Sequence, residues 1–424
     1  MDLTTSPSAS DQGGTIDLKN PDLYVQGVPH QTFAWLRAND PVHWNPETDG
    51  SGFWALTRHE DIVQVSTDPE TFSSARANGG HRIANENDTA DDSVEASMIS
   101  MDPPHHVDYR RMIMGGFTPP RLRDMEAGIR GRANVLIDAM IAEQAASGGP
   151  IDFVASFSAP YAIQTLAELF GVSAADGDKL FEWSNAVVGE DDPELRSSQD
   201  YINACIQEMA IYSMGLWQLR EETPGDDLIS MLVRSAKDGT DLPMQRYLAT
   251  FILLVVAGNE TTRNSITGGL IALDQNPDQR AALIADASLL PHAAQEIVRY
   301  VSPVMHMRRT ATRDVALGGK TIRAGDKVVM WYSSGNRDEA VFEAPDQFDI
   351  RRTAPRNGAP AAAGRHLGFG FGQHVCLGQR LAELQLKVAF ETLFERLPNL
   401  KPVSAPRRLR SNFINGIKSQ LVTF

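Results

Sequence analysis

A single cysteine in a glycine-rich loop is the feature that most constrains this chain. The loop runs from Phe369 to Gly378, reads FGFGQHVCLG and carries Cys376 near its end. The 424-residue chain holds only two cysteines, which argues against a disulfide framework and against a zinc site built from several cysteines. A lone thiolate in such a loop is instead suited to bind a metal from one side.

A helix is expected to follow this loop, over residues 378–397, because apolar residues recur at helical spacing. The first N–H groups of that helix would point back at the sulfur. Together with the helix dipole, they are expected to lower the pKa of the thiol. Glycines in the loop allow a sharp turn and a close approach to a flat ligand, as a haem with a thiolate ligand requires. The alternative is a buried cysteine with a purely structural role.

The decapeptide resembles the haem-binding loop of the cytochromes P450, F-x-x-G-x-H/R-x-C-x-G, and every specified position matches. The resemblance implies that Cys376 is the axial ligand of a non-covalently bound haem b, with Phe369 and Gly378 beside the cofactor. It also implies a mostly α fold with a small β region. The haem would lie between an oxygen-activating helix and the loop and helix that supply the cysteine.

The segment AGNETT, from Ala257 to Thr262, lies inside an apolar stretch that predicts a long buried helix ending near Pro277. A threonine there can bond back to the carbonyl one turn earlier and open a notch. A solvated polar turn on an amphipathic helix is the alternative. The segment is similar to the oxygen-activating motif of the family, which implies that Glu260 is the acid, Thr261 the alcohol, and Ala257 a neighbour of the haem.

Two further motifs occur in the order that the family shows. Glu296 and Arg299 form an E-x-x-R pair on one helical face. The resemblance implies that they support the cysteine loop with a third member, which is Arg352 or the neighbouring Arg351. The role of this network is structural.

The segment DPPHHVDYRR places His106 and Arg110 four residues apart on a helix, where they could donate hydrogen bonds to carboxylates. The resemblance implies that these two residues hold the haem propionates. His374 and Arg309 are the other propionate contacts expected from the family pattern. Arg308 lies beside Arg309 and is the alternative, although Arg309 fits the pattern better.

The chain as a whole is expected to form one catalytic domain over residues 15–424, after a disordered segment over residues 1–14. Helices are expected near 106–147, 160–185, 196–220, 244–275, 291–301 and 378–397, and strands near 41–57 and 303–332, with a hairpin at 400–424. A net charge of −15 argues against nucleic-acid binding. The first residues have neither a basic segment nor an apolar core, so a cytoplasmic protein with no membrane anchor is expected.

The resemblance implies a monooxygenase that inserts one atom of O2 into an apolar small molecule. No G-x-G-x-x-G segment for a flavin or a nicotinamide occurs, so a separate ferredoxin with its NAD(P)H-dependent reductase is expected to supply electrons. A local basic dock for it could include Arg111, Arg121, Arg123 and Lys387, and a monomer is expected. A peroxide-driven peroxygenase and a non-catalytic haem-thiolate sensor are the alternatives. The retained Glu260–Thr261 pair argues against both.

The motif detail is most similar to bacterial branches of the family that oxidise steroid side chains, terpenoids or alkyl chains. By position in the family pattern, seven apolar side chains are candidates to line the substrate pocket. Any one of them could instead pack in the core. They are Leu253, Val256, Ala257, Val304, Met305, Phe413 and Ile414.

Overall fold

The computed structural model describes residues 16–83, 97–173, 176–188, 192–195, 198–239, 242–354 and 365–424. The disorder expected for residues 1–14 therefore concerns a segment outside the described residues.

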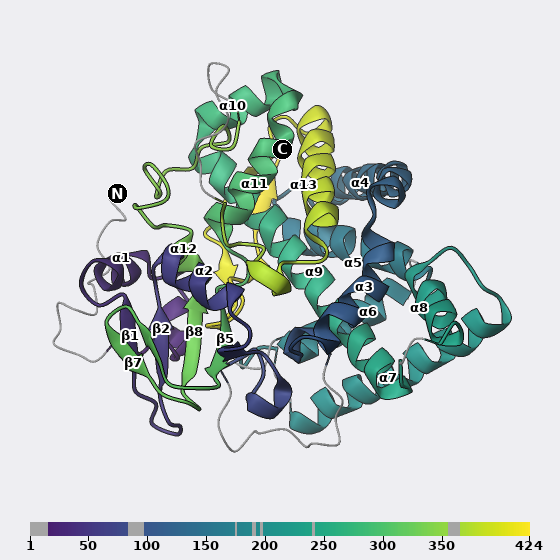
Figure 1. Ribbon diagram of the computed structural model, residues 1–424. Coiled ribbons are helices and arrows are strands. Elements are labelled where there is room, and N and C mark those ends of the chain that lie inside the picture. The colour runs from purple at the N-terminus through teal and green to yellow at the C-terminus, as the bar shows by residue number, and fades with distance from the viewer. Residues whose placement is uncertain are drawn as a thin grey trace.

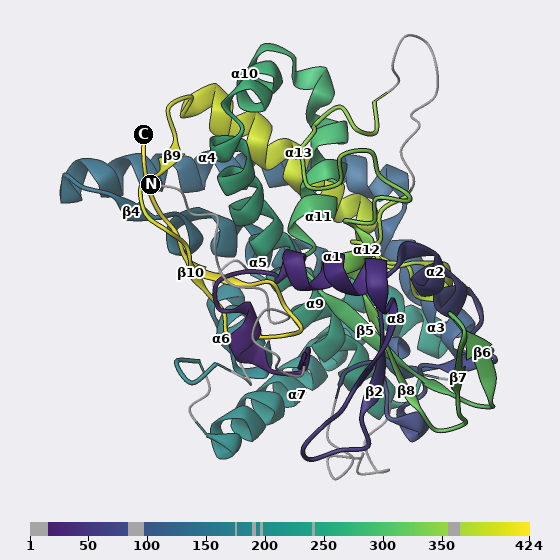
Figure 2. The ribbon, with the colours of Figure 1, turned by 90° about the vertical axis from the view of Figure 1, so that its left-hand side faces the viewer.

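Helices make up most of the described chain, as expected, and the largest sheet lies to one side of them (Figure 1). The view in Figure 2 shows the strands β2, β5 and β8 below the helices α1 and α9, with α13 above. The α-helices are α1 (His30–Asn39), α2 (His59–Thr67), α3 (His105–Met114), α4 (Pro119–Ser147), α5 (Ala159–Phe170), α6 (Gly177–Val188), α7 (Gln199–Glu222), α8 (Leu228–Lys237), α9 (Met244–Gln275), α10 (Pro277–Ala285), α11 (Leu290–Val301), α12 (Tyr332–Gly335) and α13 (Gln379–Arg396).

Helix α9 is the central element of the helical part. It contacts α5, α6, α7, α11 and α13. Its 32 residues give it a length of about 48 Å. The helix follows Pro243 and stops at Asn276, immediately before the proline that begins α10. This confirms the expected helix over 244–275. Its second half is buried on most sides, because Ile266, Thr267 and Ala272 point in different directions around the helix axis and are at most 2% exposed.

Two of the expected helices are each divided in the structure. The segment 106–147 is α3 and α4, separated by a short 3-10 turn at Gly115–Phe117. Thr118 is extended because the residue before a proline avoids the helical region, and Pro119 then starts α4. The segment 160–185 is likewise α5 and α6, and α5 ends at Gly171 in the left-handed conformation. Helices α1, α2, α8, α10 and α12 were not expected.

The largest sheet has five strands in the order β1-β2-β8-β5-β3. Strands β2 and β8 are parallel and the other neighbours are antiparallel. Its strands are β1 (Val42–Asn45), β2 (Phe53–Leu56), β3 (Phe72–Ser73), β5 (His306–Ala311) and β8 (Lys327–Trp331). These strands fall largely in the expected segments 41–57 and 303–332.

Smaller sheets complete the β region. Strands β6 (Val315–Leu317) and β7 (Lys320–Ile322) form a hairpin whose two turn residues, Gly318 and Gly319, both have positive φ. Glycine favours this type of turn because it adopts positive φ without strain. The C-terminal segment pairs in two sheets, β10-β11 and β4-β12-β9. Their strands are β4 (Ile151–Asp152), β9 (Lys401–Pro402), β10 (Arg407–Arg408), β11 (Ile417–Ser419) and β12 (Leu421–Thr423).

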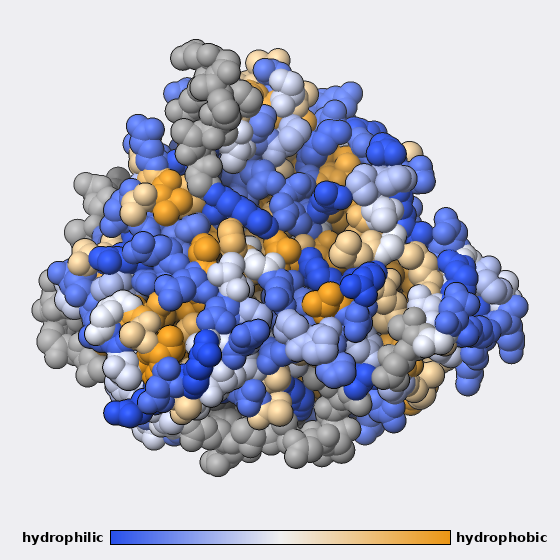
Figure 3. Space-filling view, viewed as in Figure 1, coloured by the Kyte–Doolittle hydropathy of each residue, from blue (hydrophilic) through white to orange (hydrophobic). Residues whose placement is uncertain are grey.

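The molecular surface is mixed in polarity. On the face shown in Figure 3, hydrophilic residues dominate and the hydrophobic ones are scattered among them. Within the described ranges, no helix is both long enough and apolar enough to span a membrane.

Candidate active site

The cysteine loop is held by backbone hydrogen bonds on both sides of Cys376. The N–H of Cys376 donates to the carbonyl of Phe369 at 2.7 Å, which closes the loop on itself. The N–H groups of Gly378 and Gln379, at the start of α13, lower the pKa of the Cys376 thiol. Gly372 has a φ of 68°, and any side chain there would collide with the carbonyl of Ser66 in α2. The loop therefore holds the sulfur in one position against α2 and α13.

Burial changes the expected pKa of the thiol. The two N–H donors and the charge of Arg110 lower the pKa of Cys376, as expected from the sequence, but burial is the largest effect and raises it overall. The expected lowering by the N–H groups is present, but burial outweighs it and decides the net direction of the shift. The side chain of Cys376 is exposed only toward the cavity that it lines, so a thiolate there needs a cation within that cavity, and the iron of a haem would supply that charge.

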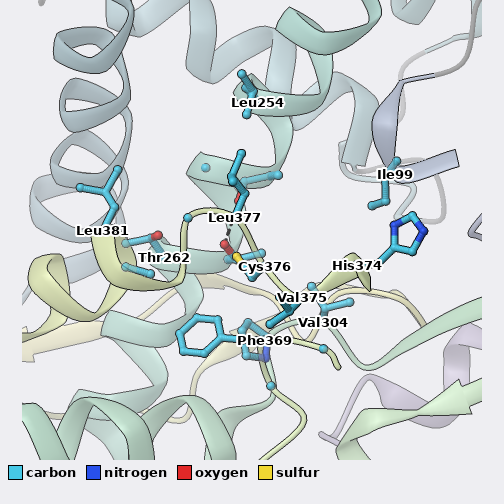
Figure 4. A pocket seen from close by; sticks show the side chains of 18 of the residues that line it. Ile99, Leu254, Thr262, Val304, Phe369, His374, Val375, Cys376, Leu377 and Leu381 are labelled. Carbon is cyan, nitrogen blue, oxygen red and sulfur yellow. Dashed lines mark hydrogen bonds between the residues drawn. The ribbon is translucent and has the colours of Figure 1, made fainter. Parts of the chain in front are cut away.

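Cys376 faces a cavity that α9 lines from another direction. Figure 4 shows Phe369, Val375 and Leu377 around the cysteine, with His374 and Ile99 further along the same cavity. Helix α9 contributes Leu253, Ala257 and Thr261, which are four residues apart and so share one face. The predicted oxygen-activating helix and the predicted ligand loop thus border a common space, which also includes Gly378.

Four basic side chains converge on this cavity from three parts of the chain. His106 and Arg110 come from α3, Arg309 from β5 and His374 from the cysteine loop. The imidazole rings of His106 and His374 have centroids 4.1 Å apart. Arg309 points into the cavity, whereas the guanidinium of Arg308 bonds to the carbonyl of Asn78 and the hydroxyl of Thr310. Arg309, and not Arg308, therefore lines the cavity.

This basic cluster is short of partners. Among the described residues, Nδ1 of His106 and Nε2 of His374 are buried without a hydrogen bond. Burial first, and then Arg110 and Arg309, lower the pKa of His106 to about 4. Burial, followed by Arg309 and His106, lowers the pKa of His374 to about 2. Buried positive charges and orphaned donors require an anionic ligand, so the site fits a haem with two carboxylates near this cluster and its iron near Cys376.

Helix α9 is opened at the predicted notch. The hydroxyl of Thr261 donates to the carbonyl of Ala257 at 2.8 Å, and the hydroxyl of Ser265 donates to the carbonyl of Thr261 at 2.8 Å. Each hydroxyl thereby competes with the N–H of the following turn for the carbonyl. Both residues line the cavity. Because the Thr261 hydroxyl donates its proton to the Ala257 carbonyl, the Thr261 oxygen presents lone pairs to the cavity.

Glu260 is not among the residues that line the cavity. Its carboxylate pairs with Arg263 one turn later, and its Oε1 has no hydrogen-bond partner in the described structure. The guanidinium of Arg263 also donates to Oδ1 of Asn185 in α6 at 3.1 Å and lies 5.5 Å from the Phe181 ring. Burial raises the pKa of Glu260, and the charge of Arg263 opposes the rise.

The E-x-x-R pair occupies a saturated network beneath the cysteine loop. Two nitrogens of Arg299 donate to the two oxygens of Glu296, both at 2.7 Å. Nε of Arg352 donates to the same carboxylate at 3.1 Å, while Arg351 is exposed. The third member of the network is thus Arg352, and the arrangement agrees with the structural role inferred from the sequence.

The candidate pocket residues divide into two groups. Leu253, Ala257 and Val304 line the cavity, whereas Val256, Met305, Phe413 and Ile414 are not among its lining residues. Met305 is buried in a separate cluster with Trp331, and Ile414 pairs through its backbone with Val304. Sequence reasoning missed Met98, Ile99, Leu254, Thr262 and Met307.

Strand geometry could have identified one of the missed residues. Met307 is two residues before Arg309, so both side chains lie on the same face of β5.

Comparisons with known proteins agree with this geometry. The sequence model of the family described as cytochrome P450 matches residues 158–418. Linalool 8-monooxygenase of Pseudomonas putida is 47% identical over 95% of this chain and 97% of that protein. Methyl-branched lipid omega-hydroxylase of Mycobacterium tuberculosis is 38% identical over 96% of this chain and 94% of that protein. A solved Mycobacterium marinum cytochrome P450 in complex with pseudoionone is 35% identical, with a TM-score of 0.87 over 99% of this chain and 100% of that one.

Proposed function

The chain belongs to the cytochrome P450 family and is a monooxygenase, and from that premise we propose that it hydroxylates an acyclic, methyl-branched terpenoid at a haem b bound through Cys376. The observation that carries the proposal is the single cavity bordered by a lone cysteine sulfur, by four basic side chains and by the notch of α9. Each of these parts answers a different requirement of haem-dependent oxygen chemistry.

The binding roles follow from the position of each group. Cys376 would bind the iron, with its sulfur stabilised by the N–H groups of Gly378 and Gln379. His106, Arg110, Arg309 and His374 would bind the two propionates, which satisfies the orphaned nitrogens of the two histidines. When bound, a thiolate-ligated haem supplies the activation of O2 and the insertion of one oxygen atom into a C–H bond.

Thr261 and Glu260 would manage protons. The Thr261 hydroxyl, bonded to the Ala257 carbonyl, would accept a hydrogen bond from a water in the notch and so orient that water. Glu260 is one residue earlier on α9 but is turned toward Arg263. A rotation of its side chain away from Arg263 would be needed before it could pass a proton toward the cavity. Its raised pKa favours holding a proton that it can deliver.

The wall of the cavity supports an apolar substrate. Leu253, Leu254, Val304, Met307 and Ile99 contribute hydrocarbon side chains. The three named relatives act on, or bind, linalool, a methyl-branched lipid and pseudoionone. The linalool 8-monooxygenase, at 47% identity, is more similar to this chain than a steroid C26-monooxygenase of Mycobacterium tuberculosis is, at 37%, and this difference supports an acyclic terpenoid over a sterol.

A separate ferredoxin with its NAD(P)H-dependent reductase would supply electrons one at a time to a monomeric enzyme. Three of the basic residues suggested for docking already have acidic neighbours. Arg111 pairs with Asp108, Arg121 with Asp226, and Lys387 with Glu126. An acidic partner would have to compete with these carboxylates, so the docking is expected to weaken steeply with added salt.

The haem-thiolate assignment has a spectroscopic test. The reduced holoenzyme with carbon monoxide should show the red-shifted Soret band of a thiolate-bound haem. A Soret band without that shift would refute Cys376 as the ligand.

The substrate assignment is tested by a spin-state titration of the ferric holoenzyme. Linalool should bind at lower concentration than a sterol or a straight-chain fatty acid. Leu253→Ala should weaken its binding by roughly tenfold or more, because one lost apolar contact in a pocket has that effect. Val256→Ala, one turn earlier than Glu260 but outside the cavity lining, is the matched control and should leave the affinity unchanged. Tighter binding of the sterol or of the fatty acid would contradict the proposed substrate class.

A further inference from the structure

A chain of polar side chains lies behind the cysteine loop, outside the cavity-lining groups. His366 precedes the loop, Gln295 comes from α11 and Glu383 comes from α13. Nε2 of His366 lies 2.6 Å from Oε1 of Gln295, and the amide nitrogen of Gln295 donates to the carboxylate of Glu383. Gln379, one turn before Glu383, donates to the same carboxylate at 2.7 Å. A chain of hydrogen bonds thus links the segment before the cysteine loop, through α11, to one acidic side chain on α13.

The hydrogen bonds assign a direction to this chain. The N–H of Gly368 donates to Nδ1 of His366 at 3.1 Å, so the proton of the neutral ring is on Nε2 and donates to Gln295. Burial first, and then the charges of Arg299 and Arg365, lower the pKa of His366 to about 3, which keeps the ring neutral. Every donor in the chain therefore points from the cysteine loop toward Glu383.

Glu383 lies within electrostatic range of the cysteine. It is seven residues after Cys376, on the second turn of α13, and the hydrogen bond from Gln379 joins it to the first turn of that helix, which begins directly after the cysteine loop. Glu383 is half-buried, and its own pKa is raised by burial, while bonds from Gln379 and Gln295 and the charge of Arg380 oppose that rise. The binding and proton roles described above make no use of this carboxylate.

We propose that Glu383 is a positioning residue that sets the ease of electron uptake at the site, by placing a negative charge behind the Cys376 sulfur and holding it there through Gln295 and His366. The inference rests on the proposed role of Cys376 as the iron ligand. One-electron reduction by the ferredoxin adds one negative charge at the iron, and a fixed carboxylate nearby opposes that addition. Outer hydrogen-bonding groups tune bound metals in this way.

The test is the reduction potential of the holoenzyme, measured by spectroelectrochemical titration. Glu383→Gln keeps the shape and one acceptor oxygen but removes the charge, so the potential should shift in the positive direction. Glu395→Gln is the matched control, because Glu395 is an exposed carboxylate on the same helix, about 18 Å further along its axis. The reduction potential of the Glu395→Gln variant should equal that of the parent protein. Arg380→Gln removes a positive charge beside Glu383 and should shift the potential in the negative direction.

The reduced carbon monoxide spectrum distinguishes a failure of the proposed function from a failure of the role proposed for Glu383. If the parent protein lacks the thiolate band, the proposed function fails. If Glu383→Gln keeps that band and its potential matches the parent, the role of Glu383 is refuted. If Glu383→Gln loses the band, Arg380→Gln decides the question, and an unshifted potential in that variant overturns the proposal.

Discussion

Two buried Glu–Arg pairs, each three residues apart on a helix, differ in how completely they are bonded. Glu296 accepts from Arg299, from Arg352 and from the backbone N–H of Asp349 at 2.9 Å. Arg299 also donates to the carbonyls of three further residues, Asn336, Pro345 and Gln347. In the pair on α9, Oε1 of Glu260 and Nε of Arg263 have no partner among the described residues.

This difference in bonding indicates that one pair has a structural role and the other a catalytic role. A buried ion pair whose donors and acceptors are all used is costly to move, and it holds the segments that it joins. A pair with unsatisfied atoms can exchange partners at lower cost. The pair on α11 therefore suits the fixed side of the site, beneath the cysteine loop. The pair on α9 suits the side where a proton must move.

The largest expected effect comes from breaking the saturated pair. Arg299→Ala leaves the Glu296 carboxylate buried with reduced compensation, which should lower the free energy of unfolding by about 3–5 kcal/mol. Urea denaturation followed by circular dichroism measures the loss. Arg351→Ala removes an exposed arginine beside the network and should change stability by no more than about 0.5 kcal/mol. Equal losses of stability in the two variants would show that the buried network contributes no more than an exposed arginine does.

The next effect is catalytic and concerns the incomplete pair. Glu260→Gln should reduce steady-state product formation by roughly 10²-fold, the lower range for removal of a proton-transferring group. The variant should nevertheless fold and bind haem, unlike Glu296→Gln. A Glu260→Gln enzyme with parental turnover would show that the carboxylate plays no part in proton delivery.

A smaller effect is expected at the neighbouring alcohol. Thr261→Ala removes the hydroxyl that bonds to Ala257, so a water in the notch would lose its orientation. The amount of product per O2 consumed should fall, with the missing oxygen recovered as peroxide or water. Thr261→Ser keeps a hydroxyl and should restore most of the coupling. Unchanged coupling in the alanine variant would contradict the assigned role.

The smallest effect is a change in the pH dependence of stability. Burial raises the pKa of Glu260 above its ordinary value of 4.5, so the native state keeps a proton that the unfolded state has released. Stability therefore falls as the pH rises from that value through the pKa of the folded state. Arg263→Met removes the charge that opposes the rise, so the fall should extend to higher pH. Urea unfolding across a pH series measures this shift.

Its control is the double variant Glu260→Gln/Arg263→Met, which has no carboxylate at this position. The extended fall should disappear in the double variant. If it persists there, another group is responsible for the pH dependence.

Local rules account for what the sequence predicted correctly. The turn before α13, the stop of α9 before Pro277 and the shared face of His106 and Arg110 each depend on residues less than two turns apart. The cavity that joins Cys376 to α9 followed from the family resemblance, since nothing in the spacing alone brings residues 261 and 376 together.

Long-range partners account for what the sequence did not show. The orientation of Glu260 depends on Arg263, which is itself held by Asn185 on a different helix. The net rise in the pKa of Cys376 depends on how much protein surrounds it. Met305 lies before the start of β5 and packs in the cluster with Trp331, whereas Met307 lies within the strand and lines the cavity.

The parallel pairing of β2 with β8 has a consequence for the synthesis of the protein. Phe53 pairs with Lys327 and Leu56 with Met330, so β2 leaves the ribosome long before its partner exists. At about 5–20 residues per second, the intervening chain takes tens of seconds to translate. During that time the β1–β2 hairpin has an unpaired edge that can bind other chains. Yield in a foreign host should therefore depend on chaperones and on growth temperature.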